Sequence, residues 1–192
     1  MNLYKLVHFV TGNFYKLSFG VTVKGKENIP KEGGVILCSN HSSNFDPIAL
    51  AILTTKRHVH FMAKKELFEN KLLKKLMDNV GTFPIDREGN DLKAIKTALR
   101  ILKNDGVVGI FPEGTRTKDM DLTKAKGGVT MIAIKAQVPI VPVHIKSNYK
   151  FLEPLQISIK EPIYYNEFYG KKLNKDDYNE LSEELLKTIY GK

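Results

Sequence analysis

Five short apolar runs recur along this chain, and segments of a different pattern separate them. The runs cover residues 33–39, 58–62, 80–85, 107–111 and 138–145. Each has the length and composition of a buried strand, and the segments between them carry apolar residues at helical spacing. This alternation is typical of α/β proteins, in which helices cover a central sheet. No repeat, low-complexity tract or long linker interrupts the 192 residues, so one α/β domain is expected.

Two helices are predicted from the spacing of their apolar residues. Their apolar faces consist of Leu92, Ile95, Leu99 and Leu102 in one segment and of Tyr178, Leu181, Leu185 and Ile189 in the other. Asp91 fits the N-cap of the first helix, and Gly106 lies just beyond its end. We interpret both faces as core-facing. The lysine-rich stretch 64–75 is interpreted as a solvated helix face, with docking of an anionic partner as the alternative.

The charge of the chain indicates an anionic partner. Thirty Lys and Arg residues against 21 Asp and Glu residues give a formal net charge of +9. Nucleic acid, an acidic membrane surface, a phosphorylated substrate or an acidic protein each fit this charge. Nucleic acid is not expected as a partner, because the sequence carries no recognisable nucleic-acid-binding motif.

Cys38 is the only cysteine of the chain. A single cysteine excludes an intramolecular disulfide and a cysteine-rich metal site, and it favours a reducing compartment. Because Cys38 lies within the apolar run 33–39, we interpret it as a small core residue and not as a nucleophile.

The N-terminal segment is apolar but too short to cross a membrane as a helix. Its longest uncharged run lies between Lys5 and Lys16, which is about half the roughly 20 residues that a spanning helix requires. Apolar residues recur there at helical spacing, namely Leu3, Leu6, Val7, Val10, Phe14 and Leu17. Residues 1–20 are therefore predicted to form an amphipathic helical segment in a membrane interface, next to a domain of residues 21–192. The alternative is that the apolar stripe packs on the protein's own core.

The stretch SNHSSNFDP, residues 39–47, places a histidine five positions before an aspartate. In one regular helix His41 and Asp46 would lie about 140° from facing each other, so only a turn could bring them together. The residues between them favour a turn, and Asp46 followed by Pro47 fits a helix N-cap and first helical position. A histidine with a carboxylate partner can act as a general base, since the carboxylate fixes the imidazole tautomer. The alternative is that Asp46 only caps a helix and His41 is a surface loop residue.

Two further loops carry cations just after predicted strands. The run 107–111 ends in FPEGTRT, where exposed backbone amides beside Arg116 suit a phosphate oxyanion, and the alternative is a plain turn with an ion pair. The run 80–85 ends in GTFPIDRE, which places Arg87 directly after a strand, and Lys126 follows the FPEGTRT loop. These three cations could converge near the ends of the strands.

The last apolar run carries the stretch VPIVPVHI. It contains Pro139 and Pro142, and proline cannot donate a hydrogen bond to a β-ladder. The two prolines therefore predict an edge strand or an irregular path.

Four segments of the chain, in this order, resemble the sequence blocks of the glycerolipid acyltransferase family. They are NHSSNFDP, GTFPIDRE, FPEGTRT and VPIVPVHI, and together they span residues 40–145. The resemblance implies a mixed central sheet flanked by helices. It also implies that His41 is the catalytic base and Asp46 its orienting partner. The residues that it assigns to the phosphate site of the acceptor are Arg87, Glu113, Gly114, Thr115, Arg116 and, matching a less constant family lysine, Lys126.

The resemblance further implies transfer of a fatty acyl chain from a thioester, carried by acyl carrier protein or coenzyme A, to a glycerol hydroxyl. The substrate's own hydroxyl would attack, His41 would take its proton, and backbone amides near the FPEGTRT loop would hold the developing oxyanion. No cofactor and no metal are expected. Lysophosphatidic acid is the expected acceptor, with glycerol-3-phosphate or a lysophospholipid with a larger headgroup as alternatives.

The same resemblance bears on membrane attachment. Many family members carry one or more spanning helices before the first block, whereas this chain carries only the short amphipathic segment. Peripheral attachment to an anionic membrane surface, at the cytoplasmic face of the cell membrane, is therefore expected.

Three functions of other classes remain as alternatives. A hydrolase would use Ser42 or Ser43 as nucleophile, but a serine so close to the histidine in a turn rarely presents its hydroxyl to the ring, and G-x-S-x-G is absent. A metal site could use His58 and His60, which share one side of a strand, but no third ligand is evident. A non-catalytic module that binds anionic lipid explains the charge and leaves the H-x4-D block unexplained.

Overall fold

The computed structural model describes residues 3–54, 57–86, 91–117 and 119–192. The strands in these ranges are β1 (Thr22–Lys24), β2 (Val35–Ser39), β3 (Val59–Lys64), β4 (Phe83–Ile85), β5 (Val107–Ile110), β6 (Ile140–Lys146) and β7 (Gln156–Ile159). The helices are α1 (Leu3–Phe19), α2 (Asp46–Ala51), α3 (Lys71–Asn79), α4 (Leu92–Lys103), α5 (Gly128–Ala136) and α6 (Lys175–Tyr190). Strands and helices alternate from β2 to β6, which confirms the predicted α/β class.

The strands of the described residues form one mixed sheet in the order β1-β7-β6-β2-β5-β3-β4. Neighbouring strands are parallel except for β6 and β7, which are antiparallel. The five predicted strands are present. The sequence pattern does not predict β1 or β7, because neither lies in a continuous apolar run: β1 is Thr-Val-Lys, and polar and apolar side chains alternate in β7.

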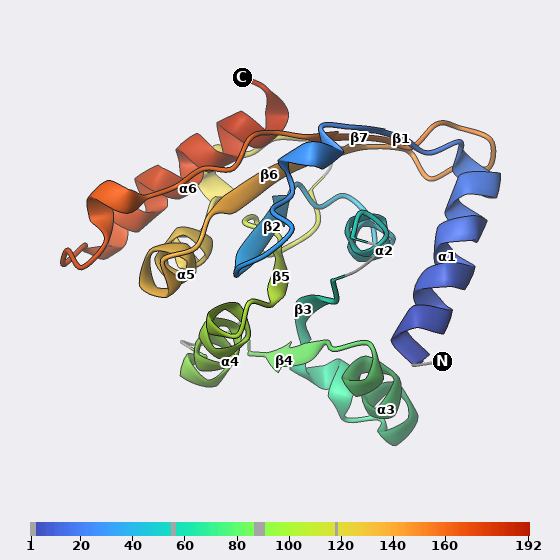
Figure 1. Cartoon of the computed structure of the whole chain (residues 1–192), viewed down its shortest axis with the longest axis horizontal. Helices are drawn as coiled ribbons and strands as arrows, with labels where there is room; N and C mark the ends of the chain where they lie inside the picture. The colour runs from blue at the N-terminus through green and yellow to red at the C-terminus, as the bar shows by residue number, and fades with distance from the viewer. Residues whose placement is uncertain (1–2, 55–56, 87–90, 118) are drawn as a thin grey trace.

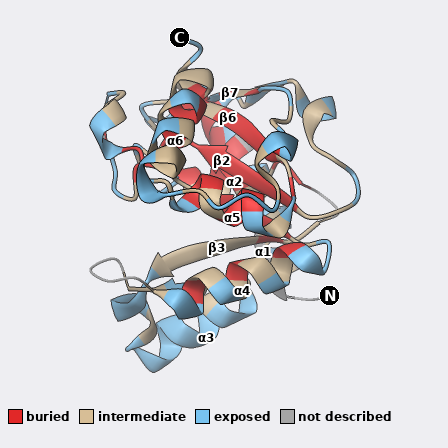
Figure 2. Cartoon of the chain, turned by 90° about the vertical axis from the view of Figure 1, so that its left-hand side faces the viewer, coloured by how far each residue is buried: buried red, intermediate tan, exposed pale blue. Residues whose placement is uncertain are grey.

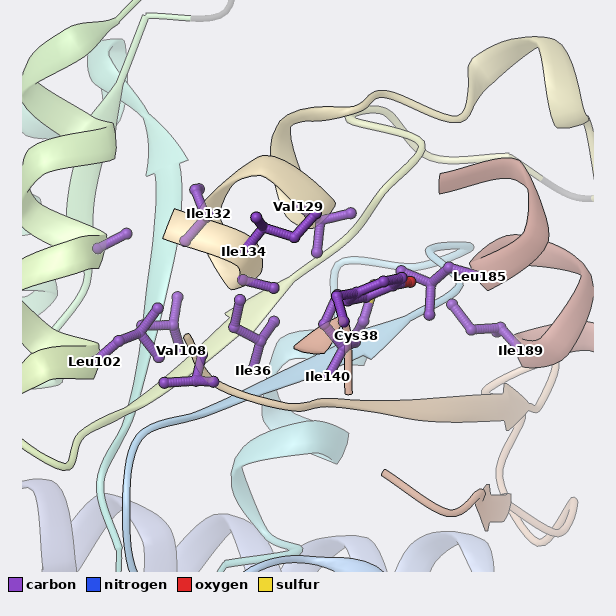
Figure 3. Packing of buried hydrophobic residues seen from close by; sticks show 14 of the residues in the cluster. Ile36, Cys38, Leu102, Val108, Val129, Ile132, Ile134, Ile140, Leu185 and Ile189 are labelled. Carbon is purple, nitrogen blue, oxygen red and sulfur yellow. The ribbon is translucent and has the colours of Figure 1, made fainter. Parts of the chain in front are cut away.

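Helices cover both faces of the sheet, and each face has its own apolar core. Figure 1 shows α4, α5 and α6 on one side of the sheet and α1 and α2 on the other. Figure 3 shows the first core, where Ile36 and Cys38 of β2 pack with Val108 of β5 and with side chains of α4, α5 and α6. The second core packs Leu50 of α2 against strand residues that face the other way, such as Leu37. Every residue of β2 is buried, as expected for a central strand covered on both faces.

Strand β6 lies inside the sheet, so the prediction of an edge strand for VPIVPVHI is wrong. It pairs with β2 on one side and with β7 on the other. Lys160 N–H donates to the Pro142 carbonyl just past the end of β7, and the antiparallel pairing resumes at a bridge between Ile140 and Ile163. The chain opposite Pro142 therefore bulges between Lys160 and Ile163. Proline is tolerated in this strand because the bulge requires no N–H donor from it.

Helices α4 and α6 follow their predicted faces with one exception. Asp91 caps α4 by accepting a hydrogen bond from the Ala94 N–H, as predicted. Leu102 is buried, but Leu92 is 64% exposed, so the prediction that Leu92 faces the core is wrong. Leu92 is the first residue of the helix, and small residues such as Ala94 take the core face at that end. In α6 the C-terminal half of the predicted face, including Leu185, is buried.

The lysine-rich stretch forms a 3-10 helix, Lys65–Phe68, and the start of α3. Neither element contains a buried residue. Figure 2 shows α3 exposed along its length, while buried residues gather in central strands such as β2 and β6. This agrees with the interpretation as a solvated helix face.

Helix α1 has one buried face and one exposed apolar face. Tyr15 and Phe19 are only 1% and 6% exposed and belong to the core on the α2 side. The residues of the predicted apolar stripe whose side chains are described face solvent, namely Leu6, Val10, Phe14 and Leu17. Packing of this stripe on the protein's own core, one of the two alternatives, is therefore wrong for these residues. Among the residues that the structure describes, no helix has the length and apolar character needed to cross a bilayer.

Candidate active site

The H-x4-D stretch lies where β2 ends and α2 begins, as the sequence predicts. His41 follows the end of β2 by two residues, and the FPEGTRT loop follows the neighbouring strand β5. Because β2 and β5 are parallel, their carboxyl ends bring His41 and this loop to the same edge of the sheet. That edge is the usual place for a ligand site in an open α/β sheet.

A hydrogen bond of 2.9 Å joins His41 Nδ1 to Asp46 Oδ2. A turn brings the two side chains together, because the N–H groups of Ser42 and Ser43 donate to the same carboxylate oxygen at 2.6 and 2.7 Å. The prediction of Asp46 as a helix N-cap is wrong. Phe45 is the N-cap of α2 and Asp46 its first residue. Its carboxylate faces back into the turn because the turn's own N–H groups and the histidine ring engage it.

The Asp46 carboxylate is fully buried, and its second oxygen accepts a hydrogen bond of 2.6 Å from the Tyr149 hydroxyl. A buried carboxylate is tolerated when several donors satisfy it. Burial, and next the nearby charge of Asp46, raise the pKa of Tyr149 well above its usual range, so this hydroxyl remains a donor. With Nδ1 of His41 bound to Asp46, Nε2 is the ring nitrogen left to accept a proton from a substrate. The His41 side chain is 12% exposed, so a small part of the ring faces solvent.

Aromatic packing fixes the plane of the His41 ring. Phe111 stacks on it, with ring centroids 4.2 Å apart and planes 21° apart. Phe61 of β3 stacks in turn on Phe111, at 6.4 Å and 13°. Gly109 makes room for this arrangement, since a Cβ atom there would lie 2.2 Å from the Phe61 ring. The stack therefore supports the ring orientation that the bond to Asp46 requires.

Glu113 is buried and connects the FPEGTRT loop to His41. Its Oε2 accepts a hydrogen bond of 2.9 Å from the His41 backbone N–H. Its Oε1 accepts hydrogen bonds from the hydroxyls of Thr117, at 2.7 Å, and Tyr190, at 3.2 Å. The Thr117 N–H donates to the His41 carbonyl at 2.7 Å. Both polar groups of the His41 backbone are thus held by this loop, and the role in a phosphate site that the resemblance implies for Glu113 stays a prediction.

Two of the three predicted cations, Arg116 and Lys126, lie at the FPEGTRT loop. The Lys126 backbone N–H donates into the loop at 3.0 Å, and its side chain passes over Gly114. Gly114 has a φ of 67°, and a Cβ atom there would lie 3.2 Å from Lys126 Nζ, so glycine suits both the turn and the close approach. Thr115 and Arg116 are exposed on the same loop. Arg87 lies outside the described residues, so the convergence of three cations stays a prediction.

Other residues complete the site beyond those that the sequence predicts. Asn40 is buried, and its side-chain amide donates to and accepts from the backbone of Ile145 at 2.9 and 2.8 Å, which extends the pairing of β2 with β6. Tyr149 and Tyr190 bond to carboxylates 103 and 77 residues away. Asn40 adjoins His41 within the first block, so the block itself could have indicated it. No local pattern marks the two tyrosines.

The residues of the alternative metal and nucleophile sites are engaged in structural contacts. The rings of His58 and His60 stack with centroids 4.5 Å apart, and each donates to a backbone carbonyl, at 2.7 and 2.9 Å. Within the described ranges, no group of three or more His, Cys, Asp and Glu side chains could hold a metal ion. Ser43 Oγ accepts a hydrogen bond from the Phe45 N–H at 3.2 Å. Burial raises the pKa of the Cys38 thiol well above its usual range, which suits a core residue.

Comparison with known proteins gives a family match. A family model described as Acyltransferase matches residues 20–146, more than half of the chain. The 1-acyl-sn-glycerol-3-phosphate acyltransferase of Bacillus subtilis (strain 168) is 42% identical over 123 residues, which are 64% of this chain and 61% of that protein. The protein of the same name from Streptococcus pneumoniae (strain ATCC BAA-255 / R6) is 31% identical over 168 residues, 85% of this chain and 59% of that protein. This chain therefore spans about three fifths of the length of these two relatives.

A solved structure is similar over nearly the whole chain. The crystal structure of the 1-acyl-sn-glycerophosphate (LPA) acyltransferase from Thermotoga maritima matches with a TM-score of 0.70 and 26% sequence identity. The match covers 98% of this chain and 82% of that chain. It confirms the predicted fold, a mixed sheet flanked by helices.

Proposed function

The chain belongs to the Acyltransferase family, and we propose that it is an enzyme that makes phosphatidic acid from lysophosphatidic acid. In this reaction a fatty acyl chain moves from a thioester of acyl carrier protein or coenzyme A to the free hydroxyl of the acceptor. The names of the relatives from B. subtilis and S. pneumoniae support this reaction and acceptor. The observation that carries the proposal is the 2.9 Å hydrogen bond between His41 and the buried Asp46 at the carboxyl edge of the sheet.

His41 acts as the general base in this mechanism. Its Nε2 takes the proton of the acceptor hydroxyl while the hydroxyl oxygen attacks the thioester carbonyl carbon. Asp46 stabilises the imidazolium that forms. When the tetrahedral intermediate collapses, the C–S bond breaks, and the departing thiolate takes the proton from His41. The attacking oxygen belongs to the substrate, so the mechanism includes no covalent acyl-enzyme.

Arg116 and Lys126 bind the phosphate of the acceptor, together with Arg87, which the sequence resemblance assigns to the same site. A phosphomonoester carries about 1.5 to 2 negative charges near pH 7, and adjacent cations compensate this charge. A phosphodiester carries one charge and a bulky headgroup that would crowd the same loop. Lysophosphatidic acid is therefore preferred over lysophosphatidylcholine.

Backbone N–H groups of the FPEGTRT loop are the proposed donors to the oxyanion. The N–H groups of Gly114 and Thr117 already donate to backbone carbonyls, at 3.1 and 2.7 Å. Thr115 and Arg116 are the exposed residues of this loop, so we assign this role to their N–H groups. Donors aimed at the place where charge develops are the usual way in which acyl transfer is accelerated.

Helix α1 holds the enzyme at the membrane as a peripheral protein. Its solvent-facing apolar residues are Leu6, Phe9, Val10, Phe14 and Leu17. This face can enter the interface of a bilayer, while Tyr15 and Phe19 anchor the helix to the core. The net charge of +9 favours an anionic surface, and we propose the cytoplasmic face of the cell membrane, where acyl thioesters are available.

The function is tested with the purified protein and three acceptors at matched concentration: lysophosphatidic acid, glycerol-3-phosphate and lysophosphatidylcholine. One long-chain acyl group is supplied in turn on acyl carrier protein and on coenzyme A, and the product is identified by mass spectrometry. Lysophosphatidic acid should react fastest. His41→Ala should lower the rate by about 10² to 10⁴ in a protein that still folds, because it removes the general base.

Three results contradict the proposal in different ways. A preference for lysophosphatidylcholine overturns the assignment of the acceptor. Thioester consumption that does not depend on an acceptor favours a hydrolase. Near-normal turnover in a folded His41→Ala protein overturns the mechanism.

A further inference from the structure

Tyr149 lies in the loop between β6 and β7 and reaches the Asp46 oxygen that His41 does not contact. Its hydroxyl donates to Oδ1 at 2.6 Å, whereas the His41 ring and two backbone N–H groups engage Oδ2. Among the described residues, Tyr149 is the donor to Oδ1. Asp46 is fully buried, so removing this hydroxyl leaves a buried carboxylate oxygen unpaired.

We propose that Tyr149 is a positioning residue that holds the Asp46 carboxylate in the orientation in which it directs the His41 ring. The inference rests on the proposed function of His41 as a general base. Tyr149 acts through Asp46 and not on the substrate. Its hydroxyl does for Oδ1 what the N–H groups of the turn do for Oδ2, so that together they restrain rotation of the carboxylate.

The backbone and ring of Tyr149 are themselves held in place. Its φ of 54° lies in the left-handed region, which a bulky residue keeps only where its surroundings impose it. Its N–H donates to Ser147 Oγ at 2.9 Å. Its ring packs against Phe19 and Phe45, with centroids 5.8 and 5.4 Å away. Contacts within the fold thus aim the hydroxyl at Asp46.

Helix α1 contributes to this support. The loop that carries Tyr149 donates two backbone hydrogen bonds to the carbonyls of Ser18 and Phe19 at the end of α1, at 2.8 and 3.0 Å. The Tyr15 hydroxyl of α1 also donates to the carbonyl of Phe45, in the turn before Asp46, at 2.9 Å. Deleting α1 would disturb these contacts together, so the role of Tyr149 has to be tested by a point substitution.

Loss of the Tyr149 hydroxyl should slow turnover more than it weakens substrate binding. The hydroxyl contacts Asp46, so its removal loosens the orientation of the His41 ring and leaves the binding contacts of the two substrates in place.

The test compares Tyr149→Phe with a matched control, Tyr165→Phe. The first substitution keeps the ring and removes only the hydroxyl. Tyr165 is also buried, at 6% exposure, and lies in the core on the other face of the sheet, so it controls for the loss of a buried tyrosine hydroxyl. In the acyl-transfer assay Tyr149→Phe should lower kcat about tenfold, the lower end expected for a lost hydrogen bond to a charged group, with little change in either KM. Only Tyr149→Phe should lower kcat in this way.

Two measurements separate this inference from the proposed function. If Tyr149→Phe lowers kcat no more than Tyr165→Phe, the positioning role is overturned. The second measurement records the ring resonances of His41 by NMR at one fixed pH and needs no turnover. These resonances should move in Tyr149→Phe and stay in place in Tyr165→Phe, and unchanged resonances in Tyr149→Phe overturn the inference. Moved resonances in a protein that transfers no acyl group support the positioning of Asp46 and overturn only the proposed function.

Discussion

Replacing Glu113 tests whether this residue supports the site or binds the acceptor. Its buried carboxylate accepts hydrogen bonds from the His41 N–H and from the hydroxyls of Thr117 and Tyr190, at 2.9, 2.7 and 3.2 Å. Glu113→Ala removes the acceptor for all three donors. Glu113→Gln keeps the size and one acceptor oxygen, and the two hydroxyls can rotate to accept from the new amide.

The expected loss of stability follows from these contacts. Each of the three donors costs about 1–3 kcal/mol when it is left without a partner, and a cavity adds to the cost. Glu113→Ala should therefore lower the free energy of unfolding by about 3 kcal/mol or more. For a domain of this size each kcal/mol lowers the melting temperature by about 2–4 °C. The expected decrease in melting temperature is therefore about 6 °C or more. Glu113→Gln removes only the negative charge that strengthens these hydrogen bonds, and it should lower the free energy of unfolding by about 1 kcal/mol.

Thermal melting and steady-state kinetics measure the two consequences separately. Glu180→Ala, at an exposed glutamate of α6, is the control and should change the free energy of unfolding by less than about 0.5 kcal/mol. Below its melting temperature, Glu113→Ala should reduce kcat at least about tenfold with little change in acceptor KM, because it releases the backbone of His41. A Glu113→Ala protein that melts like the unsubstituted one refutes the supporting role. So does a Glu113→Gln protein in which only acceptor KM rises, because the carboxylate then contacts the acceptor.

Two further perturbations separate phosphate binding from membrane binding. Arg116→Ala and Lys126→Ala should each raise KM for lysophosphatidic acid about tenfold or more, because each removes a charge-assisted contact, and leave KM for the thioester unchanged. Titration of each substrate checks this, and an effect confined to the thioester would assign these cations to the donor. Phe9→Gln combined with Leu17→Gln should weaken binding to phosphatidylglycerol vesicles about tenfold or more, since these side chains are 66% and 82% exposed. Leu92→Gln on α4 is the control in the flotation assay, and an equal loss there would contradict a specific role for α1.

The strands that the sequence predicts are those that lie in a short apolar run. β2 is the clearest case, because all of its residues are buried. β1 and β7 carry no such run and pair with each other along three residues at the edge of the sheet, so tertiary pairing defines them more than composition does. The prediction of an edge strand from Pro142 is wrong for a related reason. Whether a strand tolerates proline depends on the hydrogen bonding of the strand beside it. In β6 that neighbour is a bulge whose position no local pattern reveals.

The geometry of the site, too, could be predicted from the sequence only in part. The approach of His41 to Asp46 can be predicted because the turn between them is local and its N–H groups come from residues inside the H-x4-D block. The rigidity of the pair cannot be predicted locally, because it depends on Tyr149, 103 residues from Asp46, and on Glu113, which lies 72 residues from His41. The same carboxylate could instead have capped α2, as its position before a proline suggests. Whether Asp46 caps α2 or bonds to His41 depends on where hydrogen-bond donors lie. A buried carboxylate adopts the orientation in which both of its oxygens accept hydrogen bonds. The H-x4-D spacing therefore predicts that a histidine and an aspartate can meet, and the donor to the second oxygen determines whether they stay aligned.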